Sequence, residues 1–68
     1  METLKVTYSH EADAMIITDT VMQPEDKKIQ DVQSVGNFLI SFNKKNEIVD
    51  IEIIQASKVI KQLQNILN

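Results

Sequence analysis

The polar residues that could take part in chemistry lie in two places, around residues 10–13 and at residues 50–52. His10, the only histidine, stands with Glu11 and Asp13 and offers nitrogen and oxygen ligands within one short segment. Such a segment binds a divalent ion only weakly, because a stable metal site needs ligands that converge from several elements. The sequence therefore predicts exposed turn residues here, and no metal.

Asp50 and Glu52 form the second group, two positions apart on one expected strand. Two carboxylates on the same side of a strand, with no nucleophile beside them, do not make a general acid–base pair. Ser41 and Ser57 lack the flanking pattern of a nucleophile elbow. We therefore expect a protein that is not an enzyme and holds no cofactor. The open alternative is a small ligand-binding or hydrolytic protein that uses Glu52, Asp50 and His10.

Asp13 has a different expected role, because it stands just before a strand. A short acidic side chain in that position can accept hydrogen bonds from nearby backbone amides and fix the connection. With Glu52 and Asp50, it completes the candidate polar site.

Composition narrows the function classes. The chain has 68 residues, which predicts a single domain over residues 1–68. Its net charge of −3 argues against nucleic-acid binding, which needs a basic stripe. No apolar run approaches the roughly 18–20 residues of a membrane span, and the start lacks a secretory signal. The absence of cysteine suits a reducing compartment, so the expected location is cytoplasmic.

Hydrophobic periodicity predicts the elements that position these residues. Strands are expected over residues 4–8, 14–20, 38–42 and 47–54. Residues 24–28 indicate an exposed loop, and a short strand near residues 29–33 is favoured over a helical turn. A helix begins at residues 55–57, with Ser57 or Gln55 near its N-cap. The helix repeats apolar residues at helical spacing: Ala56, Val59, Ile60, Leu63, Ile66 and Leu67. The predicted fold is α+β: a small antiparallel meander of about four strands, with the C-terminal helix packed on one face.

The hairpin of residues 38–54 has the most readable turn. Asn43 suits the first position of a type I turn, and Asn46 suits a left-handed residue that closes a three-residue loop. The predicted pairs are then Asn43 opposite Glu47, Phe42 opposite Ile48, Ile40 opposite Asp50 and Phe38 opposite Glu52. A two-residue turn would instead slip this pairing.

This pairing predicts which residues share a face, because alternate residues of a strand point the same way. One face would carry Phe38, Ile40, Phe42, Ile48, Asp50 and Glu52, and the other Leu39, Ser41, Val49, Ile51 and Ile53. Both faces are then largely apolar, whereas a half-exposed sheet alternates apolar and polar residues. We therefore expect cover on both faces, from the helix on one and from a second copy or a protein partner on the other.

Two blocks of sequence resemble a known family. Residues 40–54, ISFNKKNEIVDIEII, followed by Gln55, Ala56 and Ser57, are similar to the signature V-D-Y-D-x-D-G-x-V-V-G-I-E-I-L of the domain-of-unknown-function 2283 family. Residues 8–17, YSHEADAMII, resemble the family's Y-D-x-E-A-D-A-L-Y-I. The departures are Ser9 and Ser41 in place of acidic residues, Ile16 in place of an aromatic residue, and Asn46 and Asp50 in place of Gly. The resemblance implies a small, functionally uncharacterised, mostly prokaryotic protein, and some members are proposed as antitoxin-like partners of small toxins.

These observations predict a non-enzymatic protein-interaction module. The expected partner is a second copy, giving a homodimer, or a small protein that an antitoxin-like or inhibitory module would mask. No nucleic-acid or membrane partner is expected. The candidate interface residues are Phe38, Ile40, Phe42 and Ile48. A purely structural subunit of a larger assembly is the remaining possibility.

Overall fold

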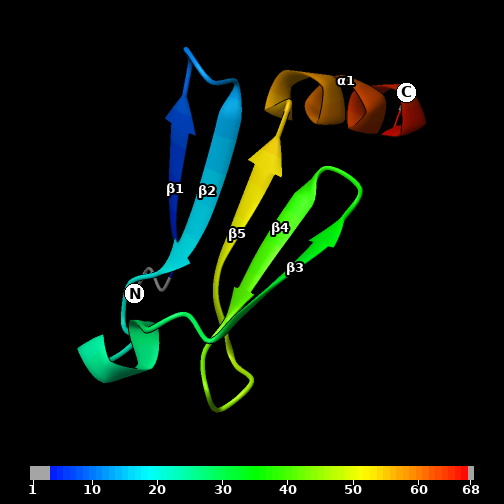
Figure 1. The fold of residues 1–68 in the computed structure, drawn as a ribbon. Coiled ribbons are helices and arrows are strands. Elements are labelled where there is room, and N and C mark those ends of the chain that lie inside the picture. The colour runs from blue at the N-terminus through cyan, green and yellow to red at the C-terminus, as the bar shows by residue number, and fades with distance from the viewer. Residues whose placement is uncertain (1–3, 68) are drawn as a thin grey trace.

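The computed structural model describes residues 4–67 as one antiparallel sheet followed by a helix (Figure 1). The elements are β1 (Leu4–Ser9), β2 (Ala14–Asp19), the 3-10 helix η1 (Pro24–Lys27), β3 (Asp31–Val35), β4 (Phe38–Phe42), β5 (Ile48–Ile54) and α1 (Ala56–Leu67). The strand order is β1-β2-β5-β4-β3, so β5 lies at the centre. The α+β class is confirmed. The sheet has five strands, and it is two joined units (β1–β2 and β3–β4–β5) rather than one continuous meander.

The segment between β2 and β4 contains the strand that the sequence placed near residues 29–33. The strand exists as β3 and begins two residues later, at Asp31. Before it, Pro24 occupies the first turn of η1, where its missing amide costs nothing. Between β3 and β4, Gly36 takes a left-handed conformation with φ of 57°. Such a tight turn favours glycine, and it lets the two strands pair directly.

The turn between β4 and β5 follows the expected chemistry. The Asn46 amide donates to the Asn43 carbonyl at 3.0 Å, and Asn46 is left-handed with φ of 64°. The Asn43 side chain, only 3% exposed, accepts from the amides of Lys45 (3.0 Å) and Glu47 (2.9 Å). Its Nδ2 donates to the Asp26 carbonyl at 2.9 Å and to Glu47 Oε1 at 3.0 Å. Asn43 therefore ties the hairpin to η1, which no local pattern predicted.

A β-bulge just beyond this turn changes the predicted register. Phe42 pairs with Ile48 as expected, but the next pair is Ser41 with Asp50, so Val49 is the extra residue. A bulge adds one residue to one strand and shifts all later pairs by one. Ile40 consequently pairs with Ile51, and Phe38 with Ile53, whereas the sequence predicted Asp50 and Glu52 as their partners. That part of the prediction is wrong, because a bulge leaves no signature as local as a turn's.

The bulge sorts the side chains of the sheet by polarity. Paired residues share a face, and alternate residues along a strand do too. The register therefore gathers one set of large apolar side chains, called the apolar face below: Leu4, Val6, Tyr8, Met15, Ile17, Val35, Phe38, Ile40, Phe42, Ile48, Ile51 and Ile53. The opposite side, called the polar face, carries Lys5, Thr7, Ser9, Ala14, Ile16, Thr18, Val32, Ser34, Leu39, Ser41, Asp50, Glu52 and Ile54. The apolar face also carries Asp19, Asp31 and Gln33. The polar face retains the aliphatic residues Ile16, Val32, Leu39 and Ile54, so the sorting is strong but not complete.

The helix α1 does not cover either face of its own sheet, which corrects the predicted packing. Figure 1 shows α1 running across the end of the sheet, beyond the turn between β3 and β4. The extensive contacts among the described residues are all between neighbouring strands. Only Gln55 separates β5 from α1, and it is left-handed with φ of 56°. This short link directs the helix away from the faces.

The chain has almost no core of its own. Among the described residues, the only buried hydrophobic side chains are Val49 and Ala56, and no large side chain is fully buried. Within residues 4–67, neither helix has the length and apolar character that crossing a membrane requires. Folding of a single copy therefore leaves most of its apolar residues in contact with water.

Candidate functional site

The apolar face brings twelve large apolar side chains to one side of the sheet. Its edges are open: Val6 on β1 is 59% exposed and Val35 on β3 is 60% exposed. Towards the centre, Ile40 and Ile51 are half-buried by their neighbours alone. Exposed apolar patches of several hundred Å² are rare on monomers and mark interaction sites. This face therefore has the character of a surface that another molecule covers.

The apolar face is not flat, because it contains a depression. Its volume is ≈350 Å³, and it is lined by five aliphatic residues and two carboxylates: Leu4, Ile17, Ile48, Val49, Ile51, Asp19 and Asp50. Its aliphatic part can accept an apolar side chain, because filling it removes apolar surface from water on both sides.

The total accessible surface supports the same conclusion. The chain exposes 5416 Å². A folded monomer of 7.8 kDa exposes about 4,400 Å² by the usual scaling of surface with mass. The radius of gyration is 13.3 Å, against about 11 Å for a compact domain of this length. The excess of about 1,000 Å² exceeds the roughly 800 Å² that each partner buries in a standard interface.

A second uncovered apolar surface lies on α1. Leu63 is 52% exposed, Ile66 77% and Leu67 83%, although they continue the stripe that Val59 and Ile60 begin. Lys58 and Lys61 stand on the opposite side of the helix, at helical angles far from that stripe. The part of the stripe beyond the buried Ala56, called the helix stripe below, is therefore uncharged: Val59, Ile60, Leu63, Ile66 and Leu67.

Asp13 holds the first turn of α1 in place. Its Oδ1 accepts from the Ser57 amide at 3.0 Å, and its Oδ2 accepts from Ser57 Oγ at 2.6 Å. Its backbone carbonyl accepts from the Ala56 amide at 2.9 Å. The Tyr8 hydroxyl donates to Oδ1 at 2.7 Å. Asp13 is itself left-handed, with φ of 49°. We call these four residues the Asp13 clamp.

The clamp satisfies a backbone amide that the side chain of a helix N-cap would usually satisfy. The Gln55 carbonyl accepts from the Val59 amide, so Gln55 occupies the N-cap position. An orphan amide of the first turn, that of Ser57, is instead satisfied by Asp13, which lies 44 residues earlier. A carboxylate at a helix N-terminus is also favoured by the helix dipole. The sequence predicted local amide partners for Asp13, whereas the structure gives it the distant helix.

Hydrogen bonding sets the ionisation of the clamp. The bonds from the Ser57 hydroxyl, from Tyr8 and from the Ser57 amide stabilise the carboxylate and hold the pKa of Asp13 below its usual value of 3.8. The same Tyr8–Asp13 bond raises the pKa of the Tyr8 phenol above 10.0. The clamp is therefore charged and fully formed at neutral pH.

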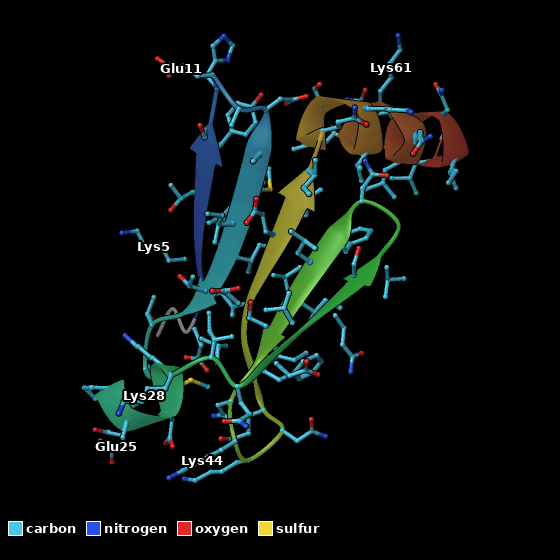
Figure 2. The ribbon with its side chains drawn as sticks, in the orientation of Figure 1. Lys5, Glu11, Glu25, Lys28, Lys44 and Lys61 are labelled. Atoms are coloured by element: carbon cyan, nitrogen blue, oxygen red, sulfur yellow. The ribbon has the colours of Figure 1, made fainter. Side chains whose placement is uncertain are left out.

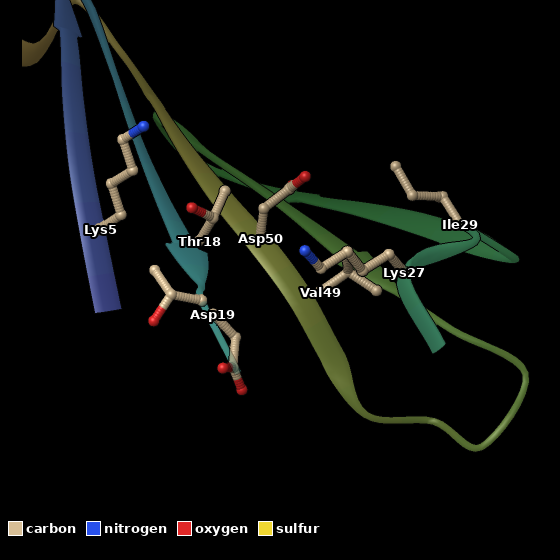
Figure 3. A pocket seen from close by; sticks show the side chains of 8 residues that line it. Lys5, Thr18, Asp19, Lys27, Ile29, Val49 and Asp50 are labelled. Carbon is tan, nitrogen blue, oxygen red and sulfur yellow. The ribbon is translucent and has the colours of Figure 1, made fainter. Parts of the chain in front are cut away.

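The polar face carries a pocket of ≈470 Å³ at the end of the sheet near η1 (Figure 3). Figure 3 shows the side chains of Lys5, Thr18 and Asp50 projecting to the same side of the sheet, as the register requires. Lys27 from η1 and Ile29 line the same pocket. Figure 2 shows other charged residues at the ends of the sheet, with Lys28, Glu25 and Lys44 at one end and Glu11 and Lys61 at the other.

The candidate polar residues do not converge. Asp50 and Glu52 share the polar face. Glu52 is level with Thr7 across the sheet, because Glu52 pairs with Ile16 and Ile16 pairs with Thr7. His10 lies three residues beyond Thr7, in the turn after β1, and so about 10 Å farther along the strand direction than Glu52. Its ring contacts that of Tyr8, with centroids 6.1 Å apart. Within residues 4–67, no group of three or more metal-ligating side chains lies together.

The candidate interface residues do lie together. Phe38, Ile40, Phe42 and Ile48 all belong to the apolar face. Sequence reasoning missed the partners that the bulge adds from β5, namely Ile51 and Ile53. It also missed the contact of Asp13 with Ser57. The sequence did contain a hint of the contact between Asp13 and Ser57, because each residue falls in one of the two blocks that resemble the family.

The comparison with family models agrees with that resemblance. The family described as "Protein of unknown function (DUF2283)" matches residues 5–57. Comparison with curated proteins and with solved structures finds no match. The matched region contains β2 to β5, all of β1 except Leu4, and both halves of the Asp13 clamp, and it ends at Ser57. Because the match covers well over half of the 68 residues, the chain belongs to the DUF2283 family.

Proposed function

We propose that this protein is a non-enzymatic interaction module whose apolar face binds an apolar surface of a protein. The observation that carries the proposal is the one-sided sorting of the sheet, with twelve large apolar residues on one face and no cover over them. Covering such a face gains roughly 25 cal/mol for each Å² of apolar surface removed from water. Because a single copy buries few apolar side chains, this gain in free energy should also stabilise the folded sheet.

The polar face is the contrasting surface and supplies the reason against an enzymatic role. Its pocket brings two lysines, Asp19 and Asp50 together, and neither a histidine nor a cysteine is among the described residues that line it. The alternative function that relied on Glu52, Asp50 and His10 needs the three in one pocket, and His10 lies beyond the end of β1. Binding through the apolar face therefore has the stronger support.

Two adjacent residues of β4 give a matched test. Ile40 belongs to the apolar face and Leu39 to the polar face, and both are half-buried. Ile40→Asp should abolish association, because an unpaired carboxylate cannot be buried in an apolar contact. Leu39→Asp should leave association unchanged. The molar mass of each variant is measured by light scattering over a range of concentrations, with circular dichroism to check that the sheet is retained.

Each result has a definite meaning. Loss of association in Ile40→Asp alone, with the sheet retained, supports the apolar face as the interface. Equal behaviour of the two variants, or a wild type that is a well-folded monomer without any partner, would contradict the proposal.

A further inference from the structure

We infer that the occupant of the apolar face is α1 of a second copy, so that two chains exchange helices and each helix covers the other chain's sheet. This inference rests on the proposed function and names its partner. The chain displays two uncovered apolar surfaces, the apolar face and the helix stripe. Each of them lacks an apolar partner, and each could serve as that partner for the other. A contact between two such surfaces from two copies is self-complementary, as a two-fold dimer requires.

The helix cannot cover its own sheet without losing its anchor. One residue, Gln55, separates β5 from α1, and the amides of Ala56 and Ser57 both donate to Asp13. Ala56 is completely buried at this joint. Folding α1 back onto the apolar face would break both hydrogen bonds and expose Ala56. Docking on another copy keeps the Asp13 clamp intact.

The dimensions of the two surfaces match. The 12 residues of α1 span about 18 Å at the usual rise of an α-helix. Five strands span about 19 Å between the axes of the edge strands. One helix is therefore long enough to cross the whole apolar face.

The surface area also fits a second copy. The chain exposes about 1,000 Å² more than a compact monomer of its mass. Two copies that each bury this excess would form an interface of about 2,000 Å² in total, at the upper end of standard size. The helix stripe brings no charge to the contact, because Lys58 and Lys61 face the other way. An interface of that size and composition is typical of a stable dimer.

The direct test is an NMR experiment on the wild-type chain. Isotope-labelled and unlabelled copies are mixed in equal amounts, and only contacts between the two kinds of chain are recorded. The expected result is a set of contacts between the methyl groups of Leu63 or Ile66 in one chain and those of Ile40 or Ile51 in the other. Contacts between chains that involve only sheet residues would overturn the helix exchange and leave the proposed function standing. A monomer without such contacts would overturn both.

A matched pair of variants tests the same inference independently. Leu63→Asp puts a carboxylate in the helix stripe, and Asn65→Asp puts one on the opposite side of the same helix. Leu63→Asp should raise the dimer dissociation constant at least about tenfold, while Asn65→Asp should change it less than about twofold. Unchanged dimerisation of Leu63→Asp would show that the helix stripe lies outside the interface, even where Ile40→Asp abolishes association.

Discussion

The two faces of the sheet are built from the same five strands, yet they differ in their share of apolar side chains. The apolar face presents mainly isoleucine, phenylalanine, valine and methionine, with Asp19, Asp31 and Gln33 beside them. The polar face presents threonine, serine, Lys5, Asp50 and Glu52, together with a smaller number of aliphatic residues. Neither face is covered in a single copy. Exposure alone therefore does not identify an interface, because water solvates the polar face well and the apolar face poorly.

The difference between the faces depends on one extra residue. Without the bulge at Val49, Ile40 would pair with Asp50, and Phe38 with Glu52. One face of this hairpin would then carry both carboxylates among its large apolar side chains. With the bulge, the aliphatic residues of β5 join those of β4. Bulges commonly re-aim side chains near functional surfaces, and this one assembles the apolar face.

The largest effect is expected when the polar face is made to resemble the apolar face. The double variant Asp50→Val with Glu52→Val should convert a defined assembly into large, polydisperse aggregates, because both faces of the sheet would then expose apolar surface that can associate. The size distribution is measured by light scattering and sedimentation.

The control removes charge without adding aliphatic surface. Asp50→Asn with Glu52→Gln should keep the wild-type assembly. A valine double variant that stays at the wild-type mass would mean that the polar face is already covered, and the contrast between the faces would fail.

The turn that precedes the bulge should show the next largest effect. Asn43→Ala removes hydrogen bonds to the amides of Lys45 and Glu47 and to the Asp26 carbonyl. The free energy of unfolding should fall by roughly 2–4 kcal/mol, because an unmade hydrogen bond to a buried group costs about 1–3 kcal/mol. Urea unfolding at one fixed protein concentration measures this loss. Lys44→Ala, in the same turn and exposed, should change stability by less than about 0.5 kcal/mol.

Acid should loosen the helix before it disturbs the sheet. The pKa of Asp13 is lower in the folded chain than in the unfolded chain, because Ser57 and Tyr8 donate to the carboxylate. Its contribution is therefore complete above the usual value of 3.8 and is lost as the pH falls through the lower folded pKa. Helical circular dichroism should decrease in that range.

Asp13→Asn isolates this contribution, since every other carboxyl group is present in both proteins. The difference in helical signal between wild type and variant should be constant at neutral pH and shrink in acid. A difference that does not vary with pH would mean that the carboxylate charge is not what holds α1.

The smallest effect should come from Asn46→Gly. Asn46 already adopts φ of 64°, and glycine reaches that conformation without strain. Stability should stay unchanged or rise by a few tenths to about 1 kcal/mol. Thermal unfolding measures the change. A clear loss of stability would show that the Asn46 side chain contributes something beyond its backbone conformation.

Local chemistry made the turn, the strands and the helix predictable. Asn43 and Asn46 act within four residues of each other, and the helix stripe has a period that any window reveals. The bulge at Val49 was not predictable in this way, because its benefit appears only when β4, β5 and β2 are considered together. The direction of α1 was missed for the same reason, since Asp13 and Ser57 are 44 residues apart. The error in register did not separate the candidate interface residues Phe38, Ile40 and Phe42, because they alternate along one strand and so share a face.

The Asp13 clamp also has a kinetic consequence. It joins the turn after β1 to the start of α1, so it can form only after β5 has paired with β2. Until then, a 12-residue helix is marginal in water by itself. Pairing of β2 with β5 should therefore precede the ordering of the helix and fix its direction. Assembly should then follow folding as a separate, concentration-dependent phase, which keeps half-folded chains from joining through their helices.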